Sequence, residues 1–81
     1  MEIRHDPEKH VFETQGAVLE YEIRGNEMLF THTFTAPEHR GKGIAAALVE
    51  EGLAFAKENN YTPVPVCPYV KSYMERHLRK E

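Results

Sequence analysis

The stretch at residues 37–56, PEHRGKGIAAALVEEGLAFA, sets two glycines among basic residues and follows them directly with a helix-forming run. Small and apolar residues recur in that run at helical spacing, at positions 45, 48, 49, 52, 53 and 56. This spacing predicts an amphipathic helix over residues 45–56 that buries one face in the core, with Leu48, Val49 and Leu53 at its centre.

The segments that precede this helix have the alternation of strands. They lie at residues 3–5, 9–14, 17–24 and 28–35. Tight turns at Gly16 and at Gly25-Asn26 join the later strands into antiparallel hairpins, because these residues accept positive φ angles. Strict alternation in the last of these strands predicts that one face carries Met28, Phe30, His32 and Phe34.

A short strand at residues 62–66 and a helix at 68–79 follow the long helix. A strand–helix–strand connection of this length places its two strands parallel in one sheet. Because proline cannot donate to a strand ladder, Pro63 and Pro65 indicate either incomplete pairing with the preceding strand or a plain edge strand. The sequence therefore predicts an α+β fold in a single domain over residues 1–81, with a mostly antiparallel sheet, one long central helix and a shorter C-terminal helix.

The composition argues against several classes of function. A net charge of -3 over 81 residues argues against nucleic-acid binding, which depends on concentrated Lys and Arg. The apolar runs are too short to span a bilayer and the N-terminus lacks an apolar signal core, so we expect no membrane partner. One cysteine cannot form an internal disulfide, and we expect a cytoplasmic protein, monomeric or weakly dimeric. The five histidines have no metal-ligand spacing, so we expect no metal site.

The glycines of residues 38–43 lie where a strand turns into the start of the long helix. The first backbone N–H groups of a helix lack intrahelical partners and carry the positive end of its dipole, so a phosphate can bind them where no Cβ intervenes. Arg40 and Lys42 would add positive charge for a diphosphate. The alternative is a tight turn with basic residues on a solvated surface. The pattern lacks both the Ser or Thr of a Walker loop and the third glycine of a dinucleotide-binding fingerprint.

The segment from Thr35 to Leu48, TAPEHRGKGIAAAL, resembles motif A of the GNAT acetyltransferases. In that superfamily the loop Q/R-x-x-G-x-G/A holds the pyrophosphate of acetyl-coenzyme A. The resemblance extends over residues 29–77 and includes the order of the elements. Position 38 is Glu where the pattern prefers Gln or Arg, which removes one expected contact. The resemblance implies that coenzyme A or acetyl-coenzyme A binds at Glu38, His39, Arg40, Gly41, Lys42, Gly43, Ile44 and Ala45.

Two further motifs make the chain similar to a small, single-domain GNAT-like family. They are His32-Thr33 and the later PVCPYV at residues 65–70. The chain is shorter than a typical member of the superfamily, and it has no room for the two helices that usually follow the first strand and help to wall the acceptor site. The resemblance therefore implies a truncated GNAT-like fold, and it does not specify the acceptor.

Cys67 is the first candidate for the chemistry. Pro68 suits the first position of a helix, which places Cys67 at the N-cap, where the helix terminus favours the thiolate. By resemblance, the end of this strand lies near the thioester of acetyl-coenzyme A, so Cys67 could accept the acetyl group as a nucleophile. The alternatives are a buried apolar side chain or a contact to the pantetheine.

Tyr73 and His32 complete the candidate catalytic set. In many GNAT enzymes a tyrosine of the last helix protonates the leaving thiolate, and we favour Tyr73 over Tyr69, which lies four residues earlier. Either tyrosine could instead be a core aromatic with its hydroxyl at the surface. His32 titrates in the range of a general base for an amine, although its position beside Phe30 and Phe34 equally suits a core histidine.

Two hypotheses follow. The first is an N-acetyltransferase that transfers acetyl from acetyl-coenzyme A to an amine of a small molecule or protein. The second is a non-catalytic coenzyme A-binding module that acts through a partner. The candidate set of Cys67, Tyr73 and His32 favours the enzyme, whereas the missing helices and the absence of a Glu or Asp base signature favour the module.

Overall fold

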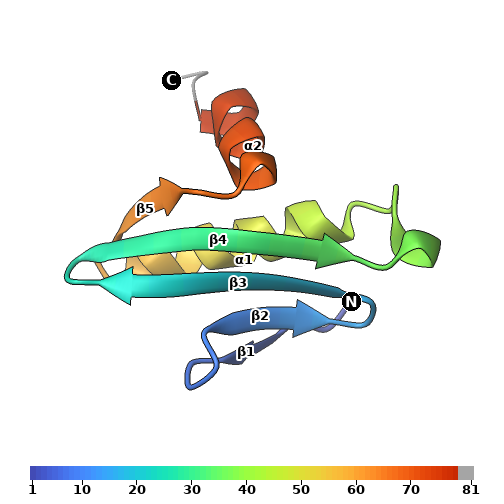
Figure 1. Cartoon of the computed structure of the whole chain (residues 1–81), viewed down its shortest axis with the longest axis horizontal. Coiled ribbons are helices and arrows are strands. Elements are labelled where there is room, and N and C mark those ends of the chain that lie inside the picture. Colours follow the sequence, from blue (N-terminus) through green and yellow to red (C-terminus); the bar gives the residue numbers. More distant parts are fainter. Residues whose placement is uncertain (79–81) are drawn as a thin grey trace.

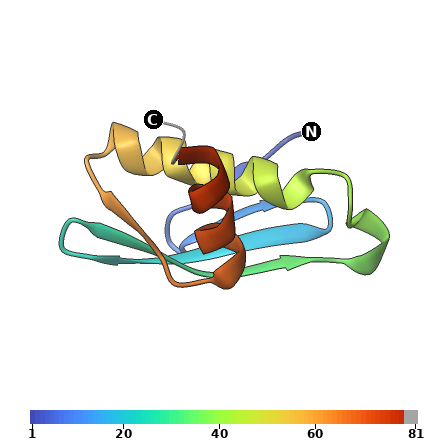
Figure 2. The same cartoon turned by 90° about the horizontal axis from the view of Figure 1, so that it is seen from above.

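Five strands form one sheet in sequence order, and two helices lie on the same side of it (Figures 1 and 2). The computed structural model describes residues 1–78. The elements are β1 (Arg4–Asp6), β2 (Val11–Thr14), β3 (Ala17–Arg24), β4 (Glu27–Thr35), the short 3₁₀ helix η1 (Pro37–His39), α1 (Ile44–Glu58), β5 (Thr62–Pro65) and α2 (Pro68–Leu78). Strands β1 to β4 pair antiparallel and β5 joins β4 in parallel, which confirms the predicted α+β fold.

The element bounds differ from the predicted ones by one or two residues. The predicted second strand began at residue 9, but Lys9 and His10 belong to a turn that the Asp6 carboxylate closes by accepting the N–H groups of Glu8 and Lys9. His10 has a positive φ of 58°, which no strand residue adopts. The predicted end of the last helix, Arg79, lies outside the described residues.

The long helix packs its small residues against the sheet. Its buried side is formed by Leu48, Val49, Gly52 and Ala56. A Cβ at Gly52 would lie 2.8 Å from Cε1 of Phe30 and 3.0 Å from Cδ2 of Leu19, so the glycine lets α1 approach the strands closely. Leu53, which we expected in the core, is only partly buried at its margin.

Strand β4 contains a bulge that changes which side chains face the helices. Tyr21 pairs with Phe30 and Glu20 pairs with His32, so Thr31 is an extra residue on β4. Beyond the bulge the alternation is shifted by one: Thr33, paired with Leu19, faces the helices, while His32 faces away. The prediction that His32 and Phe34 share a face with Phe30 is therefore wrong. His32 is exposed and Phe34 is 51% exposed.

The pairing of β4 with β5 stops half-way along β4. The register runs from Glu27 opposite Thr62 to Phe30 opposite Pro65, and residues 31–35 of β4 continue beyond it. The predicted incomplete pairing is confirmed, but its predicted cause is wrong. The N–H of Thr62 donates to the carbonyl oxygen of Asn26, in the turn just before β4, and the N–H of Val66 donates to that of Phe30 in β4. Because strand geometry has a period of two, the nitrogens of Pro63 and Pro65 face away from β4.

Leu48 provides a test of this packing, since its side chain is 1% exposed between α1 and the sheet. We expect Leu48→Ala to lower the free energy of unfolding by about 2–5 kcal/mol, because truncation leaves a cavity that the neighbours fill only in part. Urea unfolding followed by circular dichroism measures this loss. The control is Glu51→Ala on the exposed side of α1, which should change the stability by less than about 0.5 kcal/mol. An equally small effect at Leu48 would contradict the helix register.

A second test concerns His5, whose Nε2 shares a 2.6 Å hydrogen bond with the Tyr21 hydroxyl and whose ring stacks on Phe12 with centroids 4.1 Å apart. Burial lowers the pKa of His5, His10 lowers it further, and Asp6 opposes the change. The unfolded chain therefore binds this proton more readily than the folded chain. The contribution of neutral His5 to stability is complete above the unfolded pKa of about 6.5, and it is lost as the pH falls from there through the lower pKa of the folded state.

We expect His5→Phe, which keeps the stacked ring and removes the titration, to reduce the loss of stability between about pH 7.5 and pH 5.5. The measurement is the midpoint of urea unfolding at the two pH values, compared with the wild type. An unchanged difference between the two midpoints would show that His5 does not carry the pH dependence.

Candidate functional site

The connection from β4 to α1 is built on two glycines in the left-handed region. Gly41 has φ 79° and Gly43 has φ 77°, and residues with a Cβ rarely adopt these values. Gly43 is the N-cap of α1, and no side chain caps the helix there. The N–H groups of the first helical turn thus keep no partner within the helix or from the cap side chain.

Open space lies beside both glycines. A Cβ built on Gly41 or Gly43 would meet no atom within 4 Å. At Gly16, in contrast, a Cβ would collide with the ring of His39, whose Cγ lies 2.7 Å from the built position. Gly16 therefore leaves room for the His39 side chain, whereas Gly41 and Gly43 leave the loop backbone accessible to solvent or a ligand.

A cavity of about 390 Å³ opens at this loop. This loop cavity is lined by Thr33, Thr35, His39, Arg40, Gly41, Gly43, Ala45 and Tyr69. Its wall thus combines the end of β4, the glycine loop, the first turn of α1 and the first turn of α2. Arg40 fixes the loop to the strand, since its Nε donates to the carbonyl oxygen of Thr35 over 3.1 Å.

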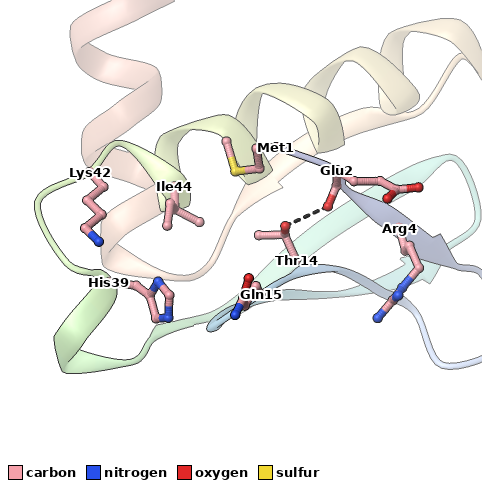
Figure 3. A pocket seen from close by; sticks show the side chains of 8 residues that line it. All are labelled: Met1, Glu2, Arg4, Thr14, Gln15, His39, Lys42 and Ile44. Atoms are coloured by element: carbon pink, nitrogen blue, oxygen red, sulfur yellow. Dashed lines mark hydrogen bonds between the residues drawn. The ribbon is translucent and has the colours of Figure 1, made fainter.

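A second hollow, of about 550 Å³, lies on the other side of the loop (Figure 3). This N-terminal hollow is lined by Met1, Glu2, Arg4, Thr14, Gln15, His39, Lys42 and Ile44. The Thr14 hydroxyl donates to the Glu2 carbonyl oxygen at 2.6 Å and ties the first residues to β2. His39 lines both spaces and so forms the wall between them.

Cys67 lies where β5 gives way to α2. Its carbonyl accepts the N–H of Lys71 at 3.0 Å, which is the first bond of the helix and confirms the predicted N-cap position. The residue is 7% exposed, and its Sγ lies 3.5 Å from the Thr33 hydroxyl oxygen. Burial raises the pKa of this thiol, but hydrogen bonds from the Thr33 hydroxyl and from the backbone of Val70, Tyr69 and Thr33 outweigh it, so the pKa falls below its ordinary value.

Comparison with protein families gives one match, to the GCN5-related N-acetyltransferase model, over residues 6–80. The chain belongs to this family. The resemblance drawn from the glycine loop, from His32-Thr33 and from the PVCPYV motif at residues 65–70 is thereby confirmed. A comparison with the curated proteins gives no match.

The site residues of this acetyltransferase family member suit the cosubstrate that the family generally uses, acetyl-coenzyme A. The loop combines two backbone positions without a Cβ, a helix N-terminus without a side-chain cap and the Arg40 side chain, which are features that diphosphate binding uses. Of the eight predicted binding residues, five line the loop cavity. Lys42 and Ile44 line the N-terminal hollow, and Glu38 lies exposed on η1.

The two candidate tyrosines, Tyr69 and Tyr73, occupy different environments. Tyr69 lines the loop cavity. Tyr73 is 6% exposed and stacks on His77, with ring centroids 4.1 Å apart. Burial, then the charge of Glu50 and then Tyr69, raise the pKa of Tyr73 above its ordinary value, so its hydroxyl stays protonated at neutral pH. The structure thus places Tyr69, rather than Tyr73, at the cavity wall.

His32 is not brought together with the other candidate catalytic residues. The bulge at Thr31 turns it to the face opposite the helices, whereas Cys67 bonds to Thr33 on the helix face. Thr33 lies at this site although the sequence analysis did not single it out as a candidate. It was quoted only as part of a motif, and an extra residue in a strand leaves no sign in the alternation itself.

Within residues 1–78, no group of three His, Cys, Asp or Glu side chains could hold a metal ion. No helix in the described part of the chain has both the length and the apolar character needed to cross a membrane.

Gly43 tests the loop as the phosphate site. We expect Gly43→Val to weaken coenzyme A binding by at least about tenfold, a loss of about 1.4 kcal/mol, because the branched side chain would fill the open space beside the loop amides. Isothermal titration calorimetry measures the affinity. The matched control is Gly25→Val in the β3–β4 turn, where φ is also positive, 60°, and space is also open. Gly25→Val places a branched residue at a similar positive φ, away from the loop, so this variant should bind coenzyme A with the affinity of the wild type. Unchanged affinity in a folded Gly43→Val protein would rule out this site.

Proposed function

We propose that this protein transfers an acetyl group from acetyl-coenzyme A to an amine of a small molecule or protein, with Cys67 as the nucleophile. One observation carries the proposal: a thiol with a lowered pKa stands at a helix N-cap, where β4 and β5 separate, one hydrogen bond away from the wall of the loop cavity. A thiol that is only a packing element would need neither the lowered pKa nor this position.

Binding, in this proposal, begins at the glycine loop. The amides between Arg40 and Ala45 hold the pyrophosphate, and the Arg40 guanidinium adds charge. The pantetheine arm then follows the edge of β4 beyond Phe30, where β5 no longer pairs with it. That path leads the thioester toward Thr33 and Cys67.

Transfer then takes two steps. The Cys67 thiolate attacks the carbonyl carbon of the thioester, a new C–S bond forms, and the bond from the acetyl carbon to the sulfur of coenzyme A breaks. The departing thiolate takes a proton from a tyrosine hydroxyl or from water. Tyr69 is better placed for this than Tyr73, because it lines the loop cavity. A neutral amine next attacks the acetyl-Cys67 thioester, expels the Cys67 thiolate and loses its extra proton to solvent.

A covalent intermediate suits so small a domain. Because the acetyl group rests on Cys67 between the steps, the acceptor does not have to be bound beside acetyl-coenzyme A, and the site needs fewer walls. His32 lies on the opposite face of the sheet and has no part in the first step. A role for it as base toward the amine, a cytoplasmic location and a monomeric or weakly dimeric state stay predictions.

The second candidate function is a coenzyme A-binding module that does not catalyse transfer. The low exposure of Cys67, 7%, favours it, because an acetyl group must reach the sulfur. The two candidates agree on the loop and differ on the thiol, so chemistry at Cys67 decides between them.

We expect the protein to gain the mass of one acetyl group when it is incubated with acetyl-coenzyme A and no amine. Intact-protein mass spectrometry measures the gain, and an added amine should discharge it. Cys67→Ala should show no gain and should lose at least about 100-fold of the transfer rate, in line with removal of a nucleophile. The control, Val66→Ala at the neighbouring exposed position, should be acetylated like the wild type.

Two results would contradict the proposal. Full transfer in folded Cys67→Ala would mean that the amine attacks acetyl-coenzyme A directly. Tight coenzyme A binding with neither acetylation nor transfer would establish the binding module instead.

A further inference from the structure

The bulge in β4 exchanges the residue that faces the helices at the point where the sheet opens. In a regular strand without the bulge, strict alternation would place His32 on the helix face with Phe30. With it, Thr33 takes that place, opposite the fully buried Leu19. Bulges recur next to active sites because they re-aim a side chain without ending the strand.

We propose that Thr33 is a positioning residue for Cys67: its hydroxyl holds the sulfur in place and stabilises the thiolate, which the β4 bulge makes possible by turning Thr33 to the helix face. The link to acetyl transfer rests on the function proposed above, whereas the effect on the thiol itself does not.

The contact joins the thiol to the loop cavity. Thr33 Oγ1 lies 3.5 Å from Cys67 Sγ, across 34 positions of sequence, and Thr33 also lines the loop cavity. Thr33 thus bonds the thiol through its side chain and also faces the space at the glycine loop. A hydroxyl is suited to this double position, because it can donate to a thiolate and can equally accept from a thiol.

Backbone bonds fix the distance between the two side chains. The carbonyl oxygen of Phe30 accepts the N–H of Val66 at 3.1 Å and the N–H of Cys67 at 2.8 Å. Cys67 is therefore held to β4 only three residues before Thr33, at the near side of the bulge. Because both ends of the contact are anchored to the same strand, the hydroxyl meets the sulfur without depending on the position of α2.

The hydrogen bonds to the Cys67 sulfur agree with this role. The side chain of Thr33 is the leading influence that lowers the pKa of Cys67, ahead of the backbone at Val70 and Tyr69. Each acts by donating to the thiolate, and together they overcome the opposing effect of burial. Loss of the hydroxyl should therefore move the titration of Cys67 toward higher pH.

The test compares Thr33→Val, which keeps the shape and removes the hydroxyl, with Thr33→Ser, which keeps the hydroxyl. The rate of iodoacetamide alkylation is followed from about pH 6 to pH 10, around the ordinary thiol pKa. The chain has one cysteine, so the rate reports on Cys67 alone. The matched control is Thr31→Val, since the Thr31 hydroxyl bonds to the Glu20 carbonyl oxygen and not to Cys67.

We expect the alkylation midpoint of Thr33→Val to lie at higher pH than that of the wild type, and those of Thr33→Ser and Thr31→Val to lie close to it. At pH 7, the acetylation rate of Thr33→Val should fall roughly tenfold, as for loss of a hydrogen bond to a charged group, and Thr33→Ser should recover most of it. Thermal unfolding monitors the fold. If Thr33→Val does not fold, Thr33→Ala removes the same hydroxyl with less bulk.

The outcomes separate this inference from the proposed function. An alkylation profile of Thr33→Val that matches the wild type overturns the role of Thr33, whatever the protein does with acetyl-coenzyme A. A shifted profile in a protein that acetyl-coenzyme A never acetylates supports the role of Thr33 and removes the transferase proposal. An equal shift in Thr31→Val would assign the effect to the bulge as a whole and overturn the specific role of the hydroxyl.

Discussion

The backbone of Phe30 is the point on which the molecule depends. Its carbonyl oxygen accepts two N–H groups, from Val66 and Cys67, and so determines where β5 stops and where the helix that follows begins. Its ring is fully buried and lies under Gly52, where it sets how closely α1 approaches the sheet. Phe30 thus contacts the core, the end of the β4–β5 pairing and the backbone of Cys67, so a shift of this residue would move all three.

Much of the fold could be predicted because local patterns determine it. The period of 3.6 in α1, the turn glycines and the alternation in β3 each require only neighbouring residues. The bulge could not be predicted in this way, because Thr31 is an ordinary strand residue whose extra place is visible only against β3. That one residue explains why His32 looked like the inward-facing side chain and why Thr33 drew no attention.

The candidate site likewise combines features that local sequence patterns predict with features that depend on contacts between distant residues. Gly41 and Gly43 mark the loop in the sequence, because glycines just before a helix leave its first N–H groups accessible to a ligand. The division of the loop residues between two cavities depends on the ring of His39 packing over Gly16, a contact across 23 positions that no local pattern encodes. The choice between Tyr69 and Tyr73 depends likewise on the phase of α2, which its packing on β5 and α1 decides.

The prolines of β5 have a consequence for the behaviour of the protein in solution. Their nitrogens would face the outer side of the strand, and neither carries a hydrogen, so that side presents carbonyl oxygens without matching donors. An incoming strand needs both backbone donors and backbone acceptors on that side to form the hydrogen bonds of a sheet. The sheet can therefore end in an exposed strand without inviting the edge-to-edge aggregation that such strands promote. Beyond Phe30, β4 thus has no pairing with β5, while the outer side of β5 itself is poorly suited to pairing with another chain.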